Sequence, residues 1–251
     1  MALPRSGNTL FASLINQNPN VACTANSITL EIMKDLYLLK QTDVFQNFPD
    51  HKSLDNIMDS VYDLYYKNWS QQYIIDRSPV MTPGNLVVMQ RHFKQPIKCI
   101  IIWRDLMDVL ASYIKWFENE PTAFPNKYGK NTIEEKLMML MNKDGAIAKE
   151  LIAIQNALKP EYKHMSHVVR YEDLVTNPEN TLRSIYNFFE IEYYPHRFHN
   201  LSQVNINGLS YDDRVVGNKM HTIKTEMKLE ENPYKKMIPQ SIIDKYGHIK
   251  L

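Results

Sequence analysis

The feature that most constrains the fold is an almost continuous apolar, β-rich run from Ile97 to Trp103, which is followed by helical spacing from about Leu106 to Glu118. Such a run is typical of a parallel strand that is covered on both faces. Shorter strand-type runs at Tyr73–Ile75 and His167–Tyr171 also alternate with helix-type segments. Because parallel strands need crossover connections, this order predicts an α/β fold. We expect a three-layer sandwich with a central parallel sheet.

Helical spacing or capping signals mark further segments on either side of these strands. The predicted helices are 8–18, 28–39, 54–66, 83–93, 132–158 with a break at Asp144–Gly145, 178–189 and 238–246. Residues 120–131 hold two prolines and a glycine and are predicted to form a loop, and Met1–Leu3 is at most the last stub of a strand. There is no internal repeat and no linker-like composition, so residues 1–251 are interpreted as one domain.

Composition excludes several classes of protein. Lys and Arg number 29 against 28 Asp and Glu, a net charge of +1, which argues against a nucleic-acid binder that works by bulk charge. Two cysteines in 251 residues form no disulfide framework and fit a reducing compartment. The longest wholly apolar run, Cys99–Trp103, is far too short for a membrane span, and no signal peptide is visible. We therefore expect a cytoplasmic protein.

The first candidate site is the loop Pro4-Arg5-Ser6-Gly7-Asn8-Thr9 between the strand stub and the first helix. Free N–H groups and the positive end of the helix dipole make such a position a site for anions. The spacing is that of a phosphate loop, but Asn8 stands where an ATP-type loop has Lys, and the cation Arg5 lies inside the loop. The alternative is a capped helix after a tight turn.

The second candidate site combines Arg104, at the end of the most convincing strand, with Ser112, eight residues later. Ligands bind at the carboxyl ends of parallel strands, and the planar guanidinium of Arg suits a phosphate. The alternative is an Arg paired with Asp105 or Asp108 and a Ser that bonds its own backbone.

Together the two segments resemble the PAPS-dependent sulfotransferases, where PAPS is 3′-phosphoadenosine-5′-phosphosulfate. Pro4–Thr9 is similar to the family loop that binds the 5′-phosphosulfate, in the Arg form of tyrosylprotein and bacterial members. Arg104 and Ser112 match the pair that binds the 3′-phosphate. The resemblance implies a P-loop NTPase-like fold and makes Arg5, Ser6, Gly7, Asn8, Thr9, Arg104 and Ser112 nucleotide-binding residues.

Three further segments extend the resemblance. Residues 168–175 resemble the family's R-Y-E-D-L segment, whose Tyr, here Tyr171, lies at the adenine; a structural aromatic is the alternative. Residues 217–220 resemble the segment that closes over the nucleotide and make Lys219 a candidate, although a solvated lysine is the alternative. Asp76-Arg77-Ser78-Pro79 looks like the family's K-x-P segment, so Arg77 is the expected second cation at the sulfuryl group.

The chain also departs from the family pattern. The first strand is cut to three residues, and Asn26 stands where tyrosine-type members have a Glu that acts as base. An acceptor hydroxyl needs a base, and the candidates are Glu31, His92 and His51, each of which has a structural alternative. We assign catalytic roles to Arg5, Glu31 and Arg77.

The resemblance implies in-line transfer of a sulfuryl group from PAPS to a hydroxyl or amine, with 3′-phosphoadenosine-5′-phosphate (PAP) as product and no metal. His164 and His167 lack a partner Cys or carboxylate at metal-ligand spacing. The acceptor is a small molecule, a carbohydrate or a peptide. Two alternatives stay open: a P-loop kinase that uses ATP and Mg²⁺, and a non-catalytic nucleotide-binding protein.

Overall fold

The structure is a computed structural model that describes residues 1–24, 27–215 and 220–251. Its centre is a parallel pair formed by β3 (Cys99–Trp103) and β4 (Ser166–Arg170), in which Cys99 lies opposite Ser166 and Trp103 opposite Arg170. All five residues of β3 are buried. Ile100 and Ile102 enter one core cluster, whereas Cys99, Ile101 and Trp103 enter the other. Alternating side chains of one strand therefore contribute to two cores, as expected of a strand that is covered on both faces.

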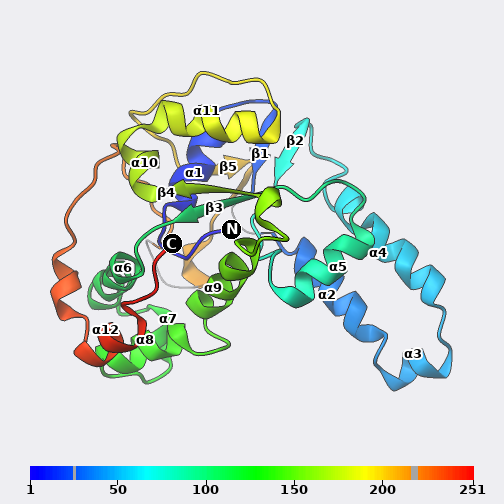
Figure 1. Cartoon of the computed structure of the whole chain (residues 1–251), viewed down its shortest axis with the longest axis horizontal. Coiled ribbons are helices and arrows are strands. Elements are labelled where there is room, and N and C mark those ends of the chain that lie inside the picture. Colours follow the sequence, from blue (N-terminus) through cyan, green and yellow to red (C-terminus); the bar gives the residue numbers. More distant parts are fainter. Residues whose placement is uncertain (25–26, 216–219) are drawn as a thin grey trace.

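Helices form the two outer layers (Figure 1). The helices α1 (Asn8–Ile15) and α11 (Pro178–Phe189) contribute to the core that contains Ile100 and Ile102. On the other face, the core includes residues of α6 (Leu106–Asn119), α8 (Ile133–Met141) and α9 (Ala146–Ala157). The predicted helical stretch 132–158 is interrupted between α8 and α9, at the expected place. The α/β layering predicted from the sequence is confirmed.

The sheet is divided, which differs from the single central sheet that we expected. Ala2 forms an isolated parallel bridge to Ile102, so the N-terminal stub runs beside β3. The Met1 amine donates to the Ile100 carbonyl at 2.7 Å, and the Ile102 N–H donates to the Met1 carbonyl at 3.0 Å. A separate parallel pair joins β1 (Val21–Cys23) to β2 (Tyr73–Ile75). With only three residues each, the stub, β1 and β2 are too short to form a long continuous ladder.

Several segments differ from the sequence-based expectation. The strand β1 was not predicted, the predicted loop 120–131 contains the short helix α7 (Phe124–Lys127), and Tyr171 begins the helix α10 (Tyr171–Thr176) instead of ending β4. An antiparallel pair, β5 (Asn205–Ile206) and β6 (Leu209–Ser210), was also missed. These elements are short, and a period of 2 or 3.6 residues has little room to show in them. The chain ends with α12 (Gln240–Tyr246).

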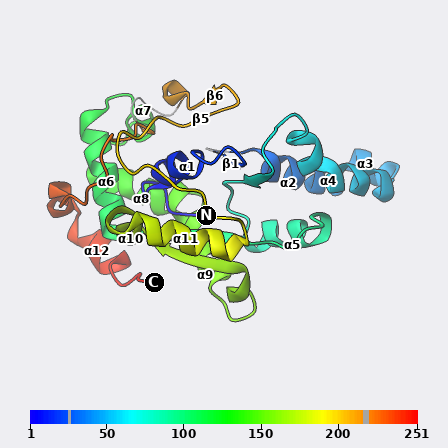
Figure 2. The same cartoon turned by 90° about the horizontal axis from the view of Figure 1, so that it is seen from above.

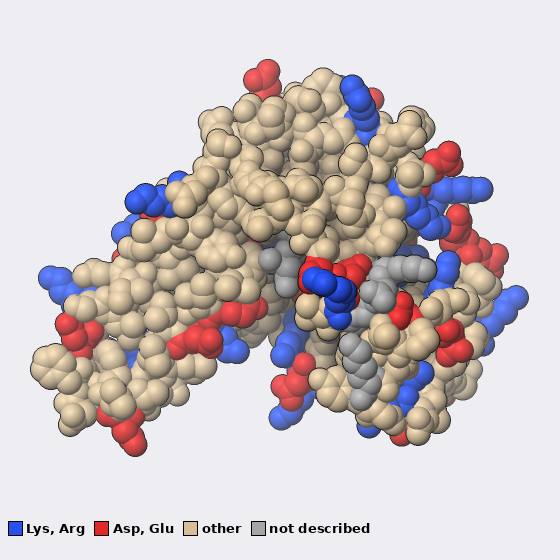
Figure 3. All heavy atoms as spheres, turned by 180° about the vertical axis from the view of Figure 1, so that it is seen from behind, with Lys and Arg blue, Asp and Glu red and all other residues tan. Residues whose placement is uncertain are grey.

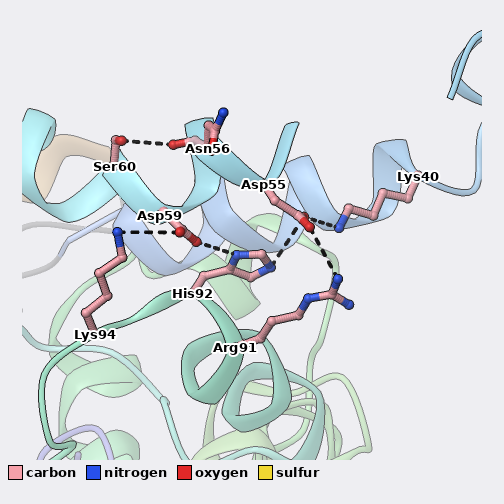
Figure 4. Close-up of polar contacts among 8 residues, drawn as sticks. All are labelled: Lys40, Asp55, Asn56, Asp59, Ser60, Arg91, His92 and Lys94. Carbon is pink, nitrogen blue, oxygen red and sulfur yellow. Dashed lines mark hydrogen bonds and ion pairs between the residues drawn. The ribbon is translucent and has the colours of Figure 1, made fainter. Parts of the chain in front are cut away.

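The helices α2 (Thr29–Leu39), α3 (Asp43–Asn47) and α4 (His51–Tyr65) form an arm that extends away from the sheet, with α5 (Pro83–His92) near its base (Figure 2). A polar network joins α2, α4 and α5 (Figure 4). The buried His92 lies 2.9 Å from Asp59 through Nδ1, and 3.9 Å from Asp55 through Nε2. Asp55 also pairs with Lys40 and Arg91. His92 thus has a structural role between helices.

Charged side chains of both signs are intermixed on the face of the molecule that Figure 3 shows. This distribution agrees with the balanced net charge of +1. Within residues 1–24, 27–215 and 220–251, no helix is long and apolar enough to cross a membrane. Cys23 and Cys99 are both buried free thiols.

Candidate functional site

The loop Pro4–Thr9 forms a tight turn between the N-terminal stub and α1. Arg5 and Gly7 both have left-handed backbone conformations, with φ of 67° and 87°. The Ser6 N–H donates to the Leu3 carbonyl at 3.2 Å, and the Asn8 side-chain amide donates to the same oxygen at 3.1 Å. The loop is therefore held by its own backbone and by the side chain of Asn8. These bonds fix the position of the α1 N-terminus.

Gly7 is required by its conformation and by its neighbour. A Cβ atom at this position would lie 2.7 Å from Cδ2 of Tyr171, which is closer than real Cβ contacts. Arg104 is a second neighbour of the Tyr171 ring, and its guanidinium carbon lies 4.5 Å from the ring centroid. Tyr171 thus links the loop to the end of β3, through a close contact and a cation–π contact.

The two predicted phosphate segments meet directly. Nε of Arg5 donates to Oγ of Ser112 at 3.1 Å, across 107 positions of sequence. Nη1 of Arg104 donates to the backbone carbonyl of Arg5 at 2.9 Å. Since Arg104 directly follows β3 and Ser112 lies in α6, the strand end, the following helix and the N-terminal loop share one corner of the fold.

A pocket of about 320 Å³ opens at this corner. Its lining combines the loop, the two strand-end arginines and a late segment of the chain. It includes Pro4, Arg5, Gly7, Asn8, Thr9, Arg77, Arg104, Ser112, Tyr171, residues 220–224 and residues 226–233. The carboxylates Glu226, Glu230 and Glu231 belong to the same lining. The pocket is therefore of mixed charge, with the cations Arg5, Arg77 and Arg104 beside the loop.

Arg77 reaches this pocket from the turn after β2. Its backbone N–H donates to Oγ1 of Thr24 at 2.9 Å. The carboxylate of the preceding Asp76 accepts from Thr24 at 3.3 Å and from Thr29 at 2.5 Å. These bonds fix the turn 76–79 against the end of β1 and the start of α2. The Arg77 side chain therefore leaves a rigid turn.

Burial changes the pKa of Arg5, the cation of the loop. Removal from water lowers the pKa of Arg5, and nearby Arg104 lowers it further, while Tyr113 and Asp213 raise it. Tyr113 is buried beneath the site, and burial raises its pKa to about 12. A poorly hydrated guanidinium attracts an anion more strongly than a hydrated one, because less water has to be displaced.

Some predicted residues lie elsewhere. Glu31 is exposed in the first turn of α2 and does not line the pocket, and neither does the exposed His51 at the start of α4. Ser6 is fully buried behind the loop, and its Oγ has no hydrogen-bond partner among the described residues. Asn26 and Lys219, with the rest of the predicted segment 217–219, lie outside the described residues.

Sequence reasoning missed a cluster at the late segment. Nδ1 of His221 lies 2.6 Å from Oδ1 of Asp213, and the His221 ring stacks on Tyr211 with 3.9 Å between centroids. Burial raises the pKa of Tyr211, while interactions with Arg77 and Thr9 lower it. The position of His221 could have indicated a role at the site, because it directly follows the segment that resembles the nucleotide-closing part of the family.

No group of three or more His, Cys, Asp or Glu side chains that could hold a metal occurs in the part of the chain that the structure describes. His167 lies 3.1 Å from Oγ of Ser184 and stacks on Phe188, which is a structural role. A second, more apolar cavity of about 800 Å³ lies between the edges of β2 and β3, and Met1, Ile75 and Ile100 are among its lining residues. Arg77 and Asn8 line both cavities.

Comparison with known proteins agrees with this geometry. A family described as "Sulfotransferase family" matches residues 1–195. The chain belongs to the sulfotransferase family. A search of curated proteins finds no match.

Three solved structures of sulfotransferases have a similar fold. The sulfotransferase domain from the curacin biosynthetic pathway is 17% identical, with a TM-score of 0.51, and the match covers 100% of this chain and 89% of that one. The sulfotransferase domain of the Synechococcus PCC 7002 olefin synthase is 14% identical (TM-score 0.56; 100% and 94% covered). Mouse sulfotransferase SULT7A1, which was solved in complex with PAP, is 13% identical (TM-score 0.56; 98% and 80% covered).

Proposed function

We propose that this sulfotransferase moves a sulfuryl group from PAPS to a hydroxyl or amine of a small-molecule, carbohydrate or peptide acceptor. The observation that carries the proposal is the meeting of Arg5, Arg104 and Ser112 in one pocket at the N-terminus of α1. Membership of the sulfotransferase family and the PAP complex of mouse SULT7A1 support the choice of donor.

The geometry suggests how the nucleotide is held. The α1 N-terminus and Arg5 face the 5′-phosphosulfate, where the N–H groups of residues 7–9 and the guanidinium supply positive potential. Arg104 and Ser112 take the 3′-phosphate, for which the planar guanidinium offers paired donors. Tyr171 contributes its aromatic face beside Arg104.

The chemistry requires stabilisation of a leaving group. During in-line transfer the bond from sulfur to the bridging phosphate oxygen breaks, and negative charge builds on that oxygen. Arg5 and the α1 N-terminus are fixed before the reaction, so they stabilise this charge without reorganisation. Arg77 lines the same pocket from a rigid turn and is the second cation for the sulfuryl oxygens.

Calorimetric titration with PAP in metal-free buffer tests the donor site. We expect the wild type to bind PAP with a Kd of about 1 μM or lower, which corresponds to a binding free energy of about −8 kcal/mol or more negative. Arg104→Ala should weaken binding at least about tenfold through loss of a charge-assisted contact. Arg183→Ala serves as the control, because Arg183 lies on the exposed face of α11 and pairs with Glu179.

The same titration with ADP and Mg²⁺ separates the alternatives. Binding of PAP without metal, together with turnover of PAPS, supports the proposal. Binding of ADP and Mg²⁺ alone contradicts it and favours a kinase. Binding of PAP without any turnover of PAPS favours a nucleotide-binding protein without transferase activity.

A further inference from the structure

The imidazole of His221 is fixed at the nucleotide pocket by three neighbours. Its Nδ1 lies 2.6 Å from Oδ1 of Asp213, and its backbone N–H donates to the other carboxylate oxygen at 3.0 Å. One face of the ring is covered by Tyr211 at an interplanar angle of 4°. Gln203 donates to the His221 carbonyl at 2.5 Å and accepts from the Ile223 N–H at 3.1 Å, which braces the chain on both sides.

This arrangement determines which ring nitrogen is available. A carboxylate at Nδ1 holds the proton there, so Nε2 carries the free lone pair. His221 lines the same pocket as Arg5 and Arg77, the two cations assigned above to the leaving oxygen and to the sulfuryl group. The side chains of His221 and Asp213 are each about 20% exposed, and His221 is the member of the pair that lines the pocket.

The charges around the ring favour a neutral imidazole. Burial lowers the pKa of His221, the contact with Asp213 raises it, and the nearby Arg77 and Arg5 lower it again. Asp213, Tyr211, Arg77 and Arg5 are the titratable groups that act on the ring. A histidine that is neutral near neutral pH can accept a proton, whereas a protonated one cannot.

We propose that His221 is the general base of the sulfuryl transfer and that Asp213 is its positioning residue; this deepens the proposed function and rests on it. The acceptor oxygen forms a bond to sulfur, and its proton passes to Nε2 of His221. The bond between sulfur and the bridging oxygen breaks, and its electron pair stays on the phosphate of PAP. His221 then releases the proton to solvent. The exposed Glu31 and His51, and the buried His92 of α5, line no part of this pocket.

Two phenols of different acidity test the assignment. Transfer from labelled PAPS is measured to phenol, which needs a base, and to 4-nitrophenol, which is largely ionised in mildly alkaline buffer; hydrolysis of PAPS is measured in parallel, with water as the acceptor. We expect His221→Gln to lower the rate with phenol by about 100-fold or more, and the rate with 4-nitrophenol by less than about tenfold. His248→Gln is the control, because His248 is an exposed histidine outside the pocket.

The pH profile supplies a readout that a merely structural role would not change. In the wild type the rate should fall on the acid side as His221 becomes protonated, below the ordinary histidine pKa of about 6.5. Asp213→Asn removes the group that raises this pKa, so the acid limb should move to lower pH and the rate should fall about tenfold or more. In His221→Gln that limb should disappear.

The outcomes are distinguishable from failure of the donor site. PAP binding by His221→Gln should stay within about threefold of wild type, since PAP lacks the sulfuryl group that His221 faces. Equal loss with both phenols, no loss with either, or an unmoved acid limb overturns the proposal. A wild-type protein that binds PAP but turns over PAPS with neither phenol nor water contradicts the proposed function instead, and favours a nucleotide-binding protein without transferase activity. A protein that fails to bind PAP contradicts the proposed function itself.

Discussion

At the scale of single residues, the contact between Gly7 and Tyr171 fixes the geometry of the loop. Gly7 combines a φ of 87° with a neighbour at 2.7 Å from its missing Cβ. Either condition alone disfavours any other residue, because left-handed backbone costs an L-residue about 1 kcal/mol or more. The two together leave little room for adjustment, since Tyr171 is also in contact with Arg104.

Gly7→Ala should therefore damage both stability and the donor site. We expect a fall in Tm of about 4 °C or more and a PAP affinity at least about tenfold weaker, because the loop and Tyr171 must both shift. Thermal unfolding and calorimetry measure the two effects. Gly84→Ala is the matched control, because its added Cβ would meet no atom within 4 Å beyond its chain neighbours and its own helix backbone, and it should leave both values near wild type. Equal effects at the two positions would refute this explanation.

The sequence was informative at positions such as Gly7, where the backbone conformation requires one residue type. The segments around Arg5, Arg104 and Tyr171 were identified from motif spacing, and the structure brings them to one pocket. The roles of these residues at the nucleotide stay predictions. His221 and Asp213 could not be found in this way, because two residues in an irregular segment, eight positions apart, carry no periodic signal.

At the scale of elements, two carboxylates on α4 connect the arm to α5. Hydrogen bonding from Lys40 lowers the pKa of Asp55, and hydrogen bonding from His92 lowers that of Asp59 (Figure 4). Both carboxylates are partly exposed, so the ion pairs are screened by solvent and each contributes modestly, about 1 kcal/mol or less. Their contribution depends on the charge of the carboxylate.

The sign of the pH dependence follows from the lowered pKa values. A carboxylate whose pKa is lower in the folded state stabilises the fold above its unfolded pKa of about 3.9, and this stabilisation is lost as the pH falls through the folded value. Asp59→Asn should lower Tm by about 2–4 °C at neutral pH, and the gap to wild type should close in acid. Thermal unfolding at a series of pH values checks this. Asp35→Asn, at an exposed position of α2, should follow the wild type throughout, and a constant gap for Asp59→Asn would argue against the ion pairs.

Elements were predictable where their pattern was long. The strand β3 and the helices α6, α9 and α11 repeat their apolar spacing over several turns or over an uninterrupted run. The short strand β1 was missed, although all three of its residues are buried. Pairing of β1 with β2 is a tertiary effect, and a three-residue segment does not encode it.

At the scale of the whole molecule, the pocket unites parts of the chain that are remote in sequence. Arg5 binds Ser112 and also the carbonyl of Met220, at 3.1 and 2.6 Å. A nucleotide that contacts these segments stabilises only the folded state, where they are together. The cytoplasmic location expected from the sequence stays a prediction.

PAP should therefore stabilise the fold as a unit. At a concentration about 100 times its Kd, a ligand adds about 2.7 kcal/mol of stability, which corresponds to a rise in Tm of about 5–10 °C for a chain of this size. Thermal unfolding with and without PAP measures the shift. Arg104→Ala, whose Kd is at least about tenfold higher, should show about half of this shift or less at the same PAP concentration. An unchanged Tm in the wild type at saturating PAP would contradict binding to the folded pocket.

The position of Met1 has a practical consequence for handling the protein. Its amine donates to the Ile100 carbonyl beside β3, and Met1 also lines the cavity between β2 and β3. Residues fused ahead of Met1 would therefore start beside β3, at a cavity that Arg77 and Asn8 also line. Leu251, by contrast, is 51% exposed. An affinity tag for purification therefore belongs after Leu251, with a spacer, because Lys250 pairs with Asp105 next to Arg104.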